Sequence, residues 1–281
     1  MKLDDALLAP SGAVSAPVVV HRAGVTATVT DWLAEETPVA LIFNGLSHVV
    51  MLATPLDLGD FALGFALTEG LLAGQAELYG VEVEPATDLG ISVHLEVSSA
   101  CFMRLKERRR QLAGRTGCGL CGTESLDQVR RPLPRLVSGS SVTSIAVSRG
   151  LRELRDGQVL QQTTGAVHAA AWCSPDGAVK LMREDVGRHN ALDKLVGAMT
   201  VARVDAAHGF ICVTSRASFE MVQKTVIAGS SLLVAVSAPT ALARQIAHDA
   251  GLCLVGFARG DDLVIYCRPE GIELPSKKVE H

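Results

Sequence analysis

Residues 208–258 read HGFICVTSRASFEMVQKTVIAGSSLLVAVSAPTALARQIAHDAGLCLVGFA, and this segment determines the fold class. Short apolar runs alternate in it with longer segments whose apolar residues recur at helical spacing, which predicts the order strand, helix, strand, helix, strand. Gly229 and Gly251 lie where each helix should end, just before the next strand. Because such crossovers are right-handed, the strands should be parallel, with their carboxyl ends on one edge of an α/β sheet.

The upstream segment, residues 17–114, shows shorter and more mixed patterns, which predict a smaller, β-rich domain of the α+β kind. Its helix is expected to begin at Asp57, as the cap, and to run to about Leu72, where Gly74 ends it. Extended runs predict the strands of this domain, at residues 18–21, 39–43, 48–53 and 91–97. We therefore predict a β-rich domain with one helix.

Composition sets two further boundaries. Residues 115–141 are rich in Gly, Ser, Thr, Pro and Arg and have few apolar anchors, so we expect a long, mobile loop there. The predicted organisation is a flexible tail at 1–16, the N-terminal domain at 17–114, the loop at 115–141 and an α/β domain at 142–281.

The overall composition excludes several classes of protein. With 48% hydrophobic and 20% charged residues, the chain can bury enough apolar surface to fold, which excludes disorder. Its apolar runs are of strand length, too short to span a membrane. A net charge of -4 and only 4% aromatic residues argue against a nucleic-acid partner. Two acidic residues directly follow the early lysine, the wrong charge order for a secretory signal, so we expect a cytoplasmic protein.

The most specific motif is Gly117-Cys118-Gly119-Leu120-Cys121-Gly122, two thiols at CxxC spacing among glycines. A zinc site needs four ligands, and without a second CxxC these thiols would need distant partners such as His168. A thioredoxin-like dithiol usually follows an aromatic residue, whereas Thr116 and Gly117 precede Cys118 here. A buried structural pair is a third reading, although glycines favour mobile or tightly turned backbone. Most of the other cysteines are expected to be buried small hydrophobes.

A fourth reading is a nucleophilic or carrier thiol on a flexible arm. Positive charge stabilises a thiolate, the form that attacks sulfur. Basic side chains lie just upstream, at Lys106, Arg108, Arg109, Arg110 and Arg115. Taken alone, this basic run is more typical of a solvated helix face. The residues by themselves leave all four readings of the CxxC pair open.

Polar residues follow each of the three expected parallel strands. They are Ser215 and Arg216 after the first strand, Ser237 after the second, and Arg259-Gly260-Asp261-Asp262 after the third. Open α/β sheets bind ligands at this edge, and arginine side chains match phosphate geometry. A polar turn between two strands is the alternative interpretation of Arg259 to Asp262.

A second polar cluster, residues 184–190, stands at the amino end of another expected helix. Arg188 and His189, together with free backbone N–H groups, suit a phosphate or another anion. For Asp185, a ligand contact and a helix cap are equally favoured. His168 lies beside a run of alanines, which on its own is more typical of a packed histidine than of a catalyst.

Seven ordered motifs resemble the FdhD family of sulfur carriers needed for formate dehydrogenase activity. They are ATPLDLGDFALGFALTEGLL, RTGCGLCG, TTGAVHAAA, REDVGRHNALDKLVGA, TSRASFEMVQKTVIAG, SAPTALA and LVGFARG, and the resemblance extends from about residue 18 to residue 269. It implies a cytidine deaminase-like, three-layer α/β/α domain in the C-terminal part, a smaller N-terminal domain and a homodimer.

The resemblance also implies a chemistry. A cysteine desulfurase would hand sulfane sulfur to Cys118 as a persulfide, with Cys121 in a supporting role. The sulfur would then pass to the molybdenum cofactor, a bis-molybdopterin guanine dinucleotide destined for the formate dehydrogenase catalytic subunit. The family's cofactor-binding stretch falls on Phe257, Ala258, Arg259, Gly260, Asp261 and Asp262. The other expected contacts are Ser215, Arg216, Ser237, His168, Arg188 and His189. GDP is the expected mimic of this ligand, and no zinc is expected.

Two alternatives belong to other classes of protein. A zinc deaminase carries a proline before its CxxC, whereas Gly117 stands there in this chain, so deamination is poorly supported. A zinc-binding or dithiol redox module that uses the CxxC pair is the alternative to sulfur transfer.

Overall fold

The computed structural model describes residues 11–113, 132–137, 139 and 141–275. The N-terminal elements are β1 (Ala13–Arg22), β2 (Val25–Ala34), β3 (Thr37–Phe43), β4 (Leu46–Ala53), α1 (Leu58–Thr68), β5 (Leu78–Val83), β6 (Ile91–Val97) and α2 (Ser99–Ala113). The C-terminal elements are β7 (Val142–Thr143), α4 (Ser144–Gly157), α5 (Val159–Thr164), β8 (His168–Cys173), β9 (Val179–Asp185), α6 (Arg188–Val201), β10 (Phe210–Val213), α7 (Phe219–Ile227), β11 (Leu232–Ala235), α8 (Ala241–Ala250), β12 (Cys253–Arg259), β13 (Asp262–Cys267) and β14 (Ile272–Glu273). Short 3-10 helices lie at Gln75–Glu77, Ala206–His208 and Pro269–Gly271.

The C-terminal domain is built on a sheet whose strand order, in the described part of the chain, is β13-β12-β11-β10-β8-β9. β10, β11 and β12 are parallel and are joined by α7 and α8, so the predicted strand, helix, strand, helix, strand order is confirmed. Gly251 ends α8 in the left-handed conformation at φ 80°, which suits a residue without a side chain. β8, β9 and β13 complete the sheet as antiparallel strands.

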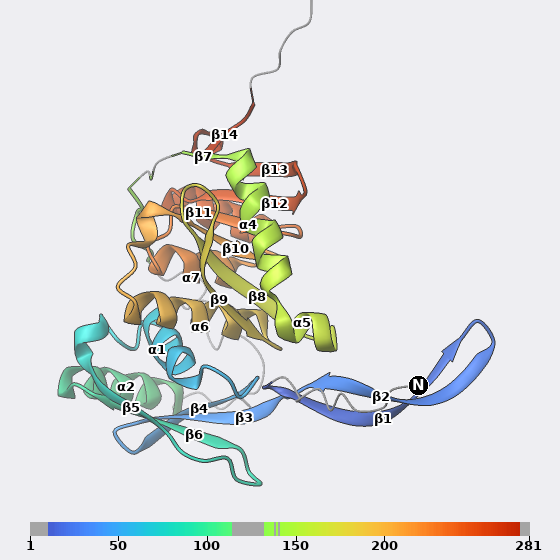
Figure 1. The fold of residues 1–281 in the computed structure, drawn as a ribbon. Coiled ribbons are helices and arrows are strands. Elements are labelled where there is room, and N and C mark those ends of the chain that lie inside the picture. The colour runs from blue at the N-terminus through green and yellow to red at the C-terminus, as the bar shows by residue number, and fades with distance from the viewer. Residues whose placement is uncertain (1–10, 114–131, 138, 140, 276–281) are drawn as a thin grey trace, which may run out of the picture.

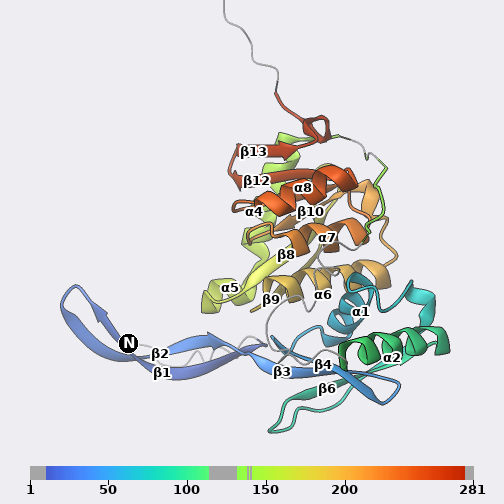
Figure 2. The same ribbon diagram turned by 180° about the vertical axis from the view of Figure 1, so that it is seen from behind.

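Helices cover both faces of this sheet (Figures 1 and 2). Side chains alternate along each strand, so Ala170 and Ile211 pack against α6, α7 and α8, whereas Ala171 and Cys212 pack against α4. The resulting α/β/α arrangement is the three-layer fold expected for the C-terminal part. The mixed α/β fold class is therefore confirmed.

The N-terminal domain is a mixed sheet of order β4-β3-β6-β5 whose inner face is covered by α1 and α2. Phe43, Phe61 and Leu105 are among the buried residues that join the three elements. The prediction of a single helix here is wrong, because α2 is a second one. Its apolar residues are sparse in a strongly charged segment, and this hides the helical period.

Three predicted boundaries also need correction. The helix α1 ends at Thr68 rather than near Leu72, and Asp57 precedes it with φ 52° and no side-chain capping bond. The tail at 1–16 is too long, because β1 already begins at Ala13. Residues 132–137 of the expected mobile loop are anchored: Leu136 donates its N–H to the Ala250 carbonyl at 2.8 Å and packs against the core.

The two domains meet where α1 crosses α6. Gly64 of α1 lies so close to α6 that a Cβ atom there would be 1.7 Å from the Asp193 carbonyl oxygen. Gly197 of α6 faces α1 in the same way, 1.9 Å from the Asp60 carbonyl. Only glycine permits this backbone-to-backbone approach. The N-terminal domain is therefore fixed directly on the helix that begins at Arg188.

β1 and β2 form a long two-stranded ribbon that extends away from both domains (Figures 1 and 2). At its base, Ala13 and Trp32 lie against Leu160 and Val167 of the C-terminal domain.

Candidate functional site

The loops that follow β10, β11 and β12 lie side by side at one edge of the sheet. Backbone hydrogen bonds connect them: Ala217 N–H to the Ala238 carbonyl at 3.3 Å, and Phe257 N–H to the Ser237 carbonyl at 3.3 Å. Arg216 is exposed in the first loop, and Ser237 is half-buried in the second. The structure thus brings these sequence-predicted residues together, as parallel strands require.

Ser215 differs from its neighbours in this loop. It is buried, and its hydroxyl donates to the Arg216 carbonyl at 3.0 Å. Its role in the described structure is therefore to hold the loop that presents Arg216.

Phe257 occupies an unusual backbone conformation at the end of β12. Its φ is 50°, a region that bulky residues rarely adopt, and it lies in an interruption of the β12–β13 pairing. Its ring is 49% exposed, whereas the next residue, Ala258, points into the core. Residues held in sparsely populated backbone conformations cluster at functional sites, which makes Phe257 a candidate functional residue.

Arg259 to Asp262 form the tight turn of the β12–β13 hairpin, with Arg259 paired to Asp262 and Gly260 at φ 56°. The side chains of Arg259, Asp261 and Asp262 are exposed. The turn interpretation of this segment is therefore correct as a description of the backbone. The exposed charges remain available to a ligand, because the hairpin needs none of them for its pairing.

His168, Arg188 and His189 form a second group at the same edge. β8 runs antiparallel to β10, so its first residue lies beside the end of β10: Ala169 N–H donates to Thr214 Oγ1 at 2.9 Å. His168 in turn pairs with the last residue of β9, directly before α6. Three strand spacings, about 14 Å, separate β8 from β12 in the order β12-β11-β10-β8. Both groups thus line one edge, as a large ligand would require.

Electrostatics distinguish the members of this second group. Burial lowers the pKa of His168, and the nearby positive groups of Arg188 and His189 lower it further, so its neutral form is favoured. The buried Nε atom of Arg188 has no hydrogen-bond partner in the described structure. A buried donor without a partner is costly, and an anion bound here would satisfy it.

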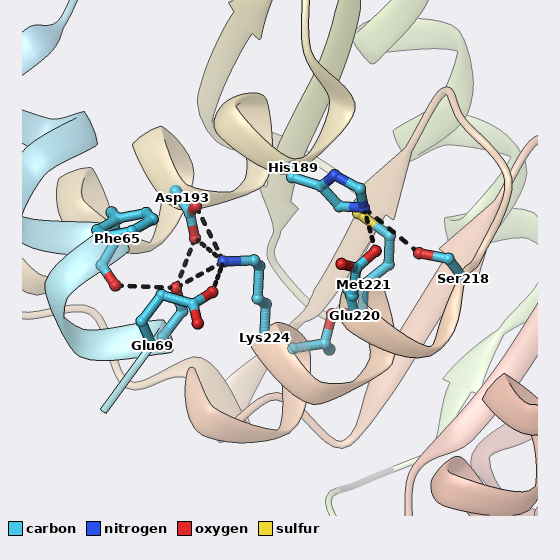
Figure 3. A network of polar contacts seen from close by, with 10 residues as sticks. Phe65, Glu69, His189, Asp193, Ser218, Glu220, Met221 and Lys224 are labelled. Carbon is cyan, nitrogen blue, oxygen red and sulfur yellow. Dashed lines mark hydrogen bonds and ion pairs between the residues drawn. The ribbon is translucent and has the colours of Figure 1, made fainter. Parts of the chain in front are cut away.

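His189 has a partner that the sequence did not indicate. Its Nε2 atom lies 2.9 Å from Glu220 Oε2 and 3.5 Å from Ser218 Oγ (Figure 3). The hydrogen bond with His189 is the main reason why the pKa of Glu220 is lowered. Glu220 stands in the first turn of α7, where an acidic residue is normally explained by the helix dipole. Its distance in sequence from His189 concealed the pair.

Asp185 is a structural residue. Its Oδ1 atom accepts from Gly187 N–H at 2.8 Å and from Asn190 at 3.0 Å, and its Oδ2 atom accepts from Thr54 N–H at 3.0 Å. Lys194 completes its contacts at 2.7 Å. The N-cap of α6 is Gly187, without a side-chain capping bond, so Asp185 is not the expected helix cap; it is a buried polar anchor between the two domains.

Deeper in the same interface, Lys224 of α7 binds α1 and α6 together (Figure 3). Its Nζ atom lies 2.8 Å from Glu69 Oε1 and 2.9 Å from Asp193 Oδ1. Burial opposes the charge of Lys224, but these two carboxylates outweigh it and raise its pKa. Burial acts on the Asp193 carboxyl in the opposite sense and raises its pKa. The ionised pair is the consistent assignment, because Lys224 also donates to the second oxygen of Asp193 at 3.0 Å.

Cys118 and Cys121 lie outside the described residues. The described cysteines are all buried, namely Cys101, Cys173, Cys212, Cys253 and Cys267. Burial raises the pKa of the Cys253 thiol to about 12 and also raises that of Cys212. Neither thiol can supply a thiolate near neutral pH. The expectation that most cysteines are small buried hydrophobes is confirmed for these five.

No group of three or more metal-ligating side chains occurs within residues 11–113, 132–137, 139 and 141–275. The His-x-Glu sequence that a zinc deaminase uses occurs here as His94-Leu95-Glu96. It lies on β6 in the sheet of the N-terminal domain, where His94 contacts Glu84 at 3.1 Å. No helix of the described chain is long and apolar enough to cross a membrane.

Comparison with known proteins identifies the family. The model of the FdhD/NarQ family matches residues 34–273. The chain belongs to the FdhD/NarQ family. A "Sulfur carrier protein FdhD" of Variovorax paradoxus is 63% identical over 269 residues, which cover 96% of each chain. A protein of the same description from Bordetella petrii is 53% identical over 92% of this chain and 94% of its own length.

A solved structure shares the fold of this chain. The crystal structure of a proposed formate dehydrogenase accessory protein from Desulfotalea psychrophila superimposes with a TM-score of 0.76 and 22% identity. The match covers 93% of this chain and 99% of that one. At this identity the likeness supports the fold, and the fold agrees with the α/β domains described above.

Proposed function

We propose that this protein is a sulfur carrier that serves formate dehydrogenase. The observation that carries the proposal is the match to curated sulfur carriers over almost the whole chain, up to 63% identity over 96% of it. The family motifs quoted above, including the CxxC pair and the polar sheet edge, belong to the matched region.

Sulfur transfer requires an accessible thiolate, and Cys118 is the proposed carrier. The Cys118 thiolate attacks the outer sulfur of the persulfide on a cysteine desulfurase. The S–S bond of that persulfide breaks, the desulfurase cysteine leaves as a thiolate, and Cys118 becomes a persulfide. The buried Cys212 and Cys253 are unsuitable for this step, because burial raises the pKa of both thiols and so disfavours the thiolate. Cys121 supports the exchange.

The acceptor of the sulfur is the molybdenum cofactor, a bis-molybdopterin guanine dinucleotide, which supplies the metal centre that formate dehydrogenase uses. Its phosphates would lie against Arg216, Arg188 and His189, and its guanine against the exposed carboxylates of Asp261 and Asp262. Two features support this placement: the unpartnered Nε atom of Arg188 and the strained, exposed Phe257. His168, Ser237 and the backbone of the hairpin turn would line the space between. We further propose that the protein acts in the cytoplasm as a homodimer.

Mass spectrometry tests the carrier role directly. After incubation with a cysteine desulfurase and cysteine, the wild-type protein should gain one sulfur atom, and Cys118→Ala should gain none. Cys121→Ala is the matched control, which should still load. Equal loading of Cys118→Ala would refute the assignment. Stoichiometric zinc in the purified protein that is lost in both variants would favour the zinc or redox module instead.

A further inference from the structure

The ribbon formed by β1 and β2 has two chemically different faces. Residues directly opposite in a strand pair share a face, and residues two apart along a strand share it too. One face therefore carries five cross-strand pairs, Val14–Leu33, Ala16–Asp31, Val18–Val29, Val20–Ala27 and Arg22–Val25. The other carries Ala13–Ala34, Ser15–Trp32, Pro17–Thr30, Val19–Thr28 and His21–Thr26. The first set is named the valine face below.

The valine face is partly exposed: Ala16, Val18 and Val20 are half-buried, and the other residues of this face are exposed. The second face turns toward the body at its base, where Ala13, Ala34 and Trp32 pack against the C-terminal domain. At the base of the valine face, by contrast, Val14 is 47% and Leu33 45% exposed, and farther along this face Val29 is 43% and Val25 68% exposed. Beyond the base, the second face is exposed as well, with Val19 at 71%. A two-stranded ribbon on its own is marginally stable in water, and contiguous exposed apolar surface usually marks an interaction site.

The charges on the valine face indicate what covers it. Arg22 lies at the tip, and Asp31 lies near the base, opposite Ala16. Six residue steps along β1, from Ala16 to Arg22, separate the two charges by about 20 Å, so the charges cannot pair within one ribbon. Neither side chain has an ion-pair partner in the described part of the chain.

We propose that the valine face is the interface with a second copy of this chain, packed tip to base about a two-fold axis. A two-fold axis at the level of the Val19–Thr28 pair places Arg22 of each copy beside Asp31 of the other. The same operation places Val18 over the partner's Val20 and Val29 over the partner's Ala27. This two-fold rotation therefore brings Arg22 beside Asp31 at both ends of the contact and buries the apolar pairs that lie between the two ends. The face is complementary to itself.

This inference deepens the homodimer of the proposed function and does not depend on sulfur transfer. The test measures the oligomeric state of the full chain by sedimentation velocity over a range of concentrations. The wild type should be a dimer. Asp31→Arg places two arginines together at each end of the contact, and the dimer dissociation constant should rise roughly tenfold or more. Arg22→Asp should act in the same direction.

Two further variants separate a lost contact from a damaged fold. The double variant Arg22→Asp with Asp31→Arg exchanges the charges and should restore the dimer. Asp88→Arg makes the same change of charge at an exposed turn residue before β6 and should leave the dimer intact. A monomeric wild type, an Asp31→Arg dimer as tight as wild type, or a charge exchange that fails to restore association overturns the proposal. A ribbon that instead binds the desulfurase would appear as a monomer whose desulfurase binding is lost in Asp31→Arg.

Sulfur loading of Cys118, measured on the same samples, keeps the two proposals distinct. Loading of wild type and Asp31→Arg should be equal. Failure of the wild type to load would count against the carrier function and leave the interface standing.

Discussion

Lys194 Nζ lies 2.7 Å from Asp185 Oδ2, and both side chains are completely buried. The pair also binds the backbone of Thr54, the residue that follows β4. Lys194 donates to the Thr54 carbonyl at 2.9 Å, and Asp185 accepts from the Thr54 N–H at 3.0 Å. The start of α6, which presents Arg188 and His189, is therefore attached to the N-terminal domain through buried polar contacts.

Removal of Asp185 should destabilise the protein strongly. Asp185→Ala leaves the Lys194 ammonium buried without a counter-charge, which should lower the free energy of unfolding by about 3–5 kcal/mol. Asp156→Ala is the matched control, because Asp156 is 64% exposed and contacts Arg155 only at 3.5 Å. Its effect should stay within about 1 kcal/mol. Urea denaturation of the two variants checks this, and similar losses in both would contradict the buried pair.

Because α1 and α6 pack closely, a glycine-to-alanine substitution should change the stability of the protein differently at two positions of α1. Gly64→Ala must push α6 away and should cost about 1–3 kcal/mol of unfolding free energy. At Gly59 a Cβ atom would meet nothing within 4 Å. Gly59→Ala should therefore be neutral or stabilise by up to about 1 kcal/mol, since alanine is the better helix former. Thermal unfolding of the pair measures the contrast, and equal stability of the variants would rule out the contact.

Guanine selectivity tests the proposed ligand edge. Calorimetry should show tighter binding of GDP than of ADP, because the carboxylates of Asp261 and Asp262 can accept the paired N–H groups of guanine. Asp261→Ala or Asp262→Ala should abolish this preference. Arg216→Ala should weaken both nucleotides by about tenfold or more through loss of a charge-assisted phosphate contact. Asp156→Ala again serves as the control, and binding that is indifferent to the base would remove the site.

His168 should report the presence of an anion. Burial, Arg188 and His189 lower its pKa below the ordinary 6.5, so the folded protein favours the neutral ring. The unfolded chain binds the proton more readily, so the contribution of neutral His168 to stability is complete above pH 6.5 and is lost as the pH falls toward the lower, folded pKa.

Binding of GDP should raise the pKa of His168, because the phosphates offset the nearby positive charge. Histidine ring resonances followed by NMR through a pH titration measure this shift. Arg188→Gln should raise the pKa without any ligand and should reduce the effect of GDP. No change on GDP binding would place the phosphates away from this group.

The amino-acid pattern alone was sufficient to predict the C-terminal α/β domain and the edge at which its polar residues gather. Residues 208–258 carry short-range information, namely apolar periods and the helix-ending Gly251, and β10, β11 and the first four residues of β12 are buried on both faces. The local sequence pattern is sufficient to predict a helix or strand where the apolar residues that form the pattern are also the buried ones. The helix α2 escaped prediction because its charged residues dilute that pattern, and β2 (Val25–Ala34) because nearly all of its side chains are exposed.

Which polar residues contact one another could be seen only in the folded chain. Asp185 was compatible with either a cap or a ligand contact until Lys194 and Thr54 were found around it. His189 and Glu220 form a pair although they come from different helices, and nothing in their local sequence indicates the contact. Such pairs depend on how the helices pack over the sheet, because two charged side chains interact only when they are close in space. Long-range contacts, such as that of Gly64 with α6, set this distance.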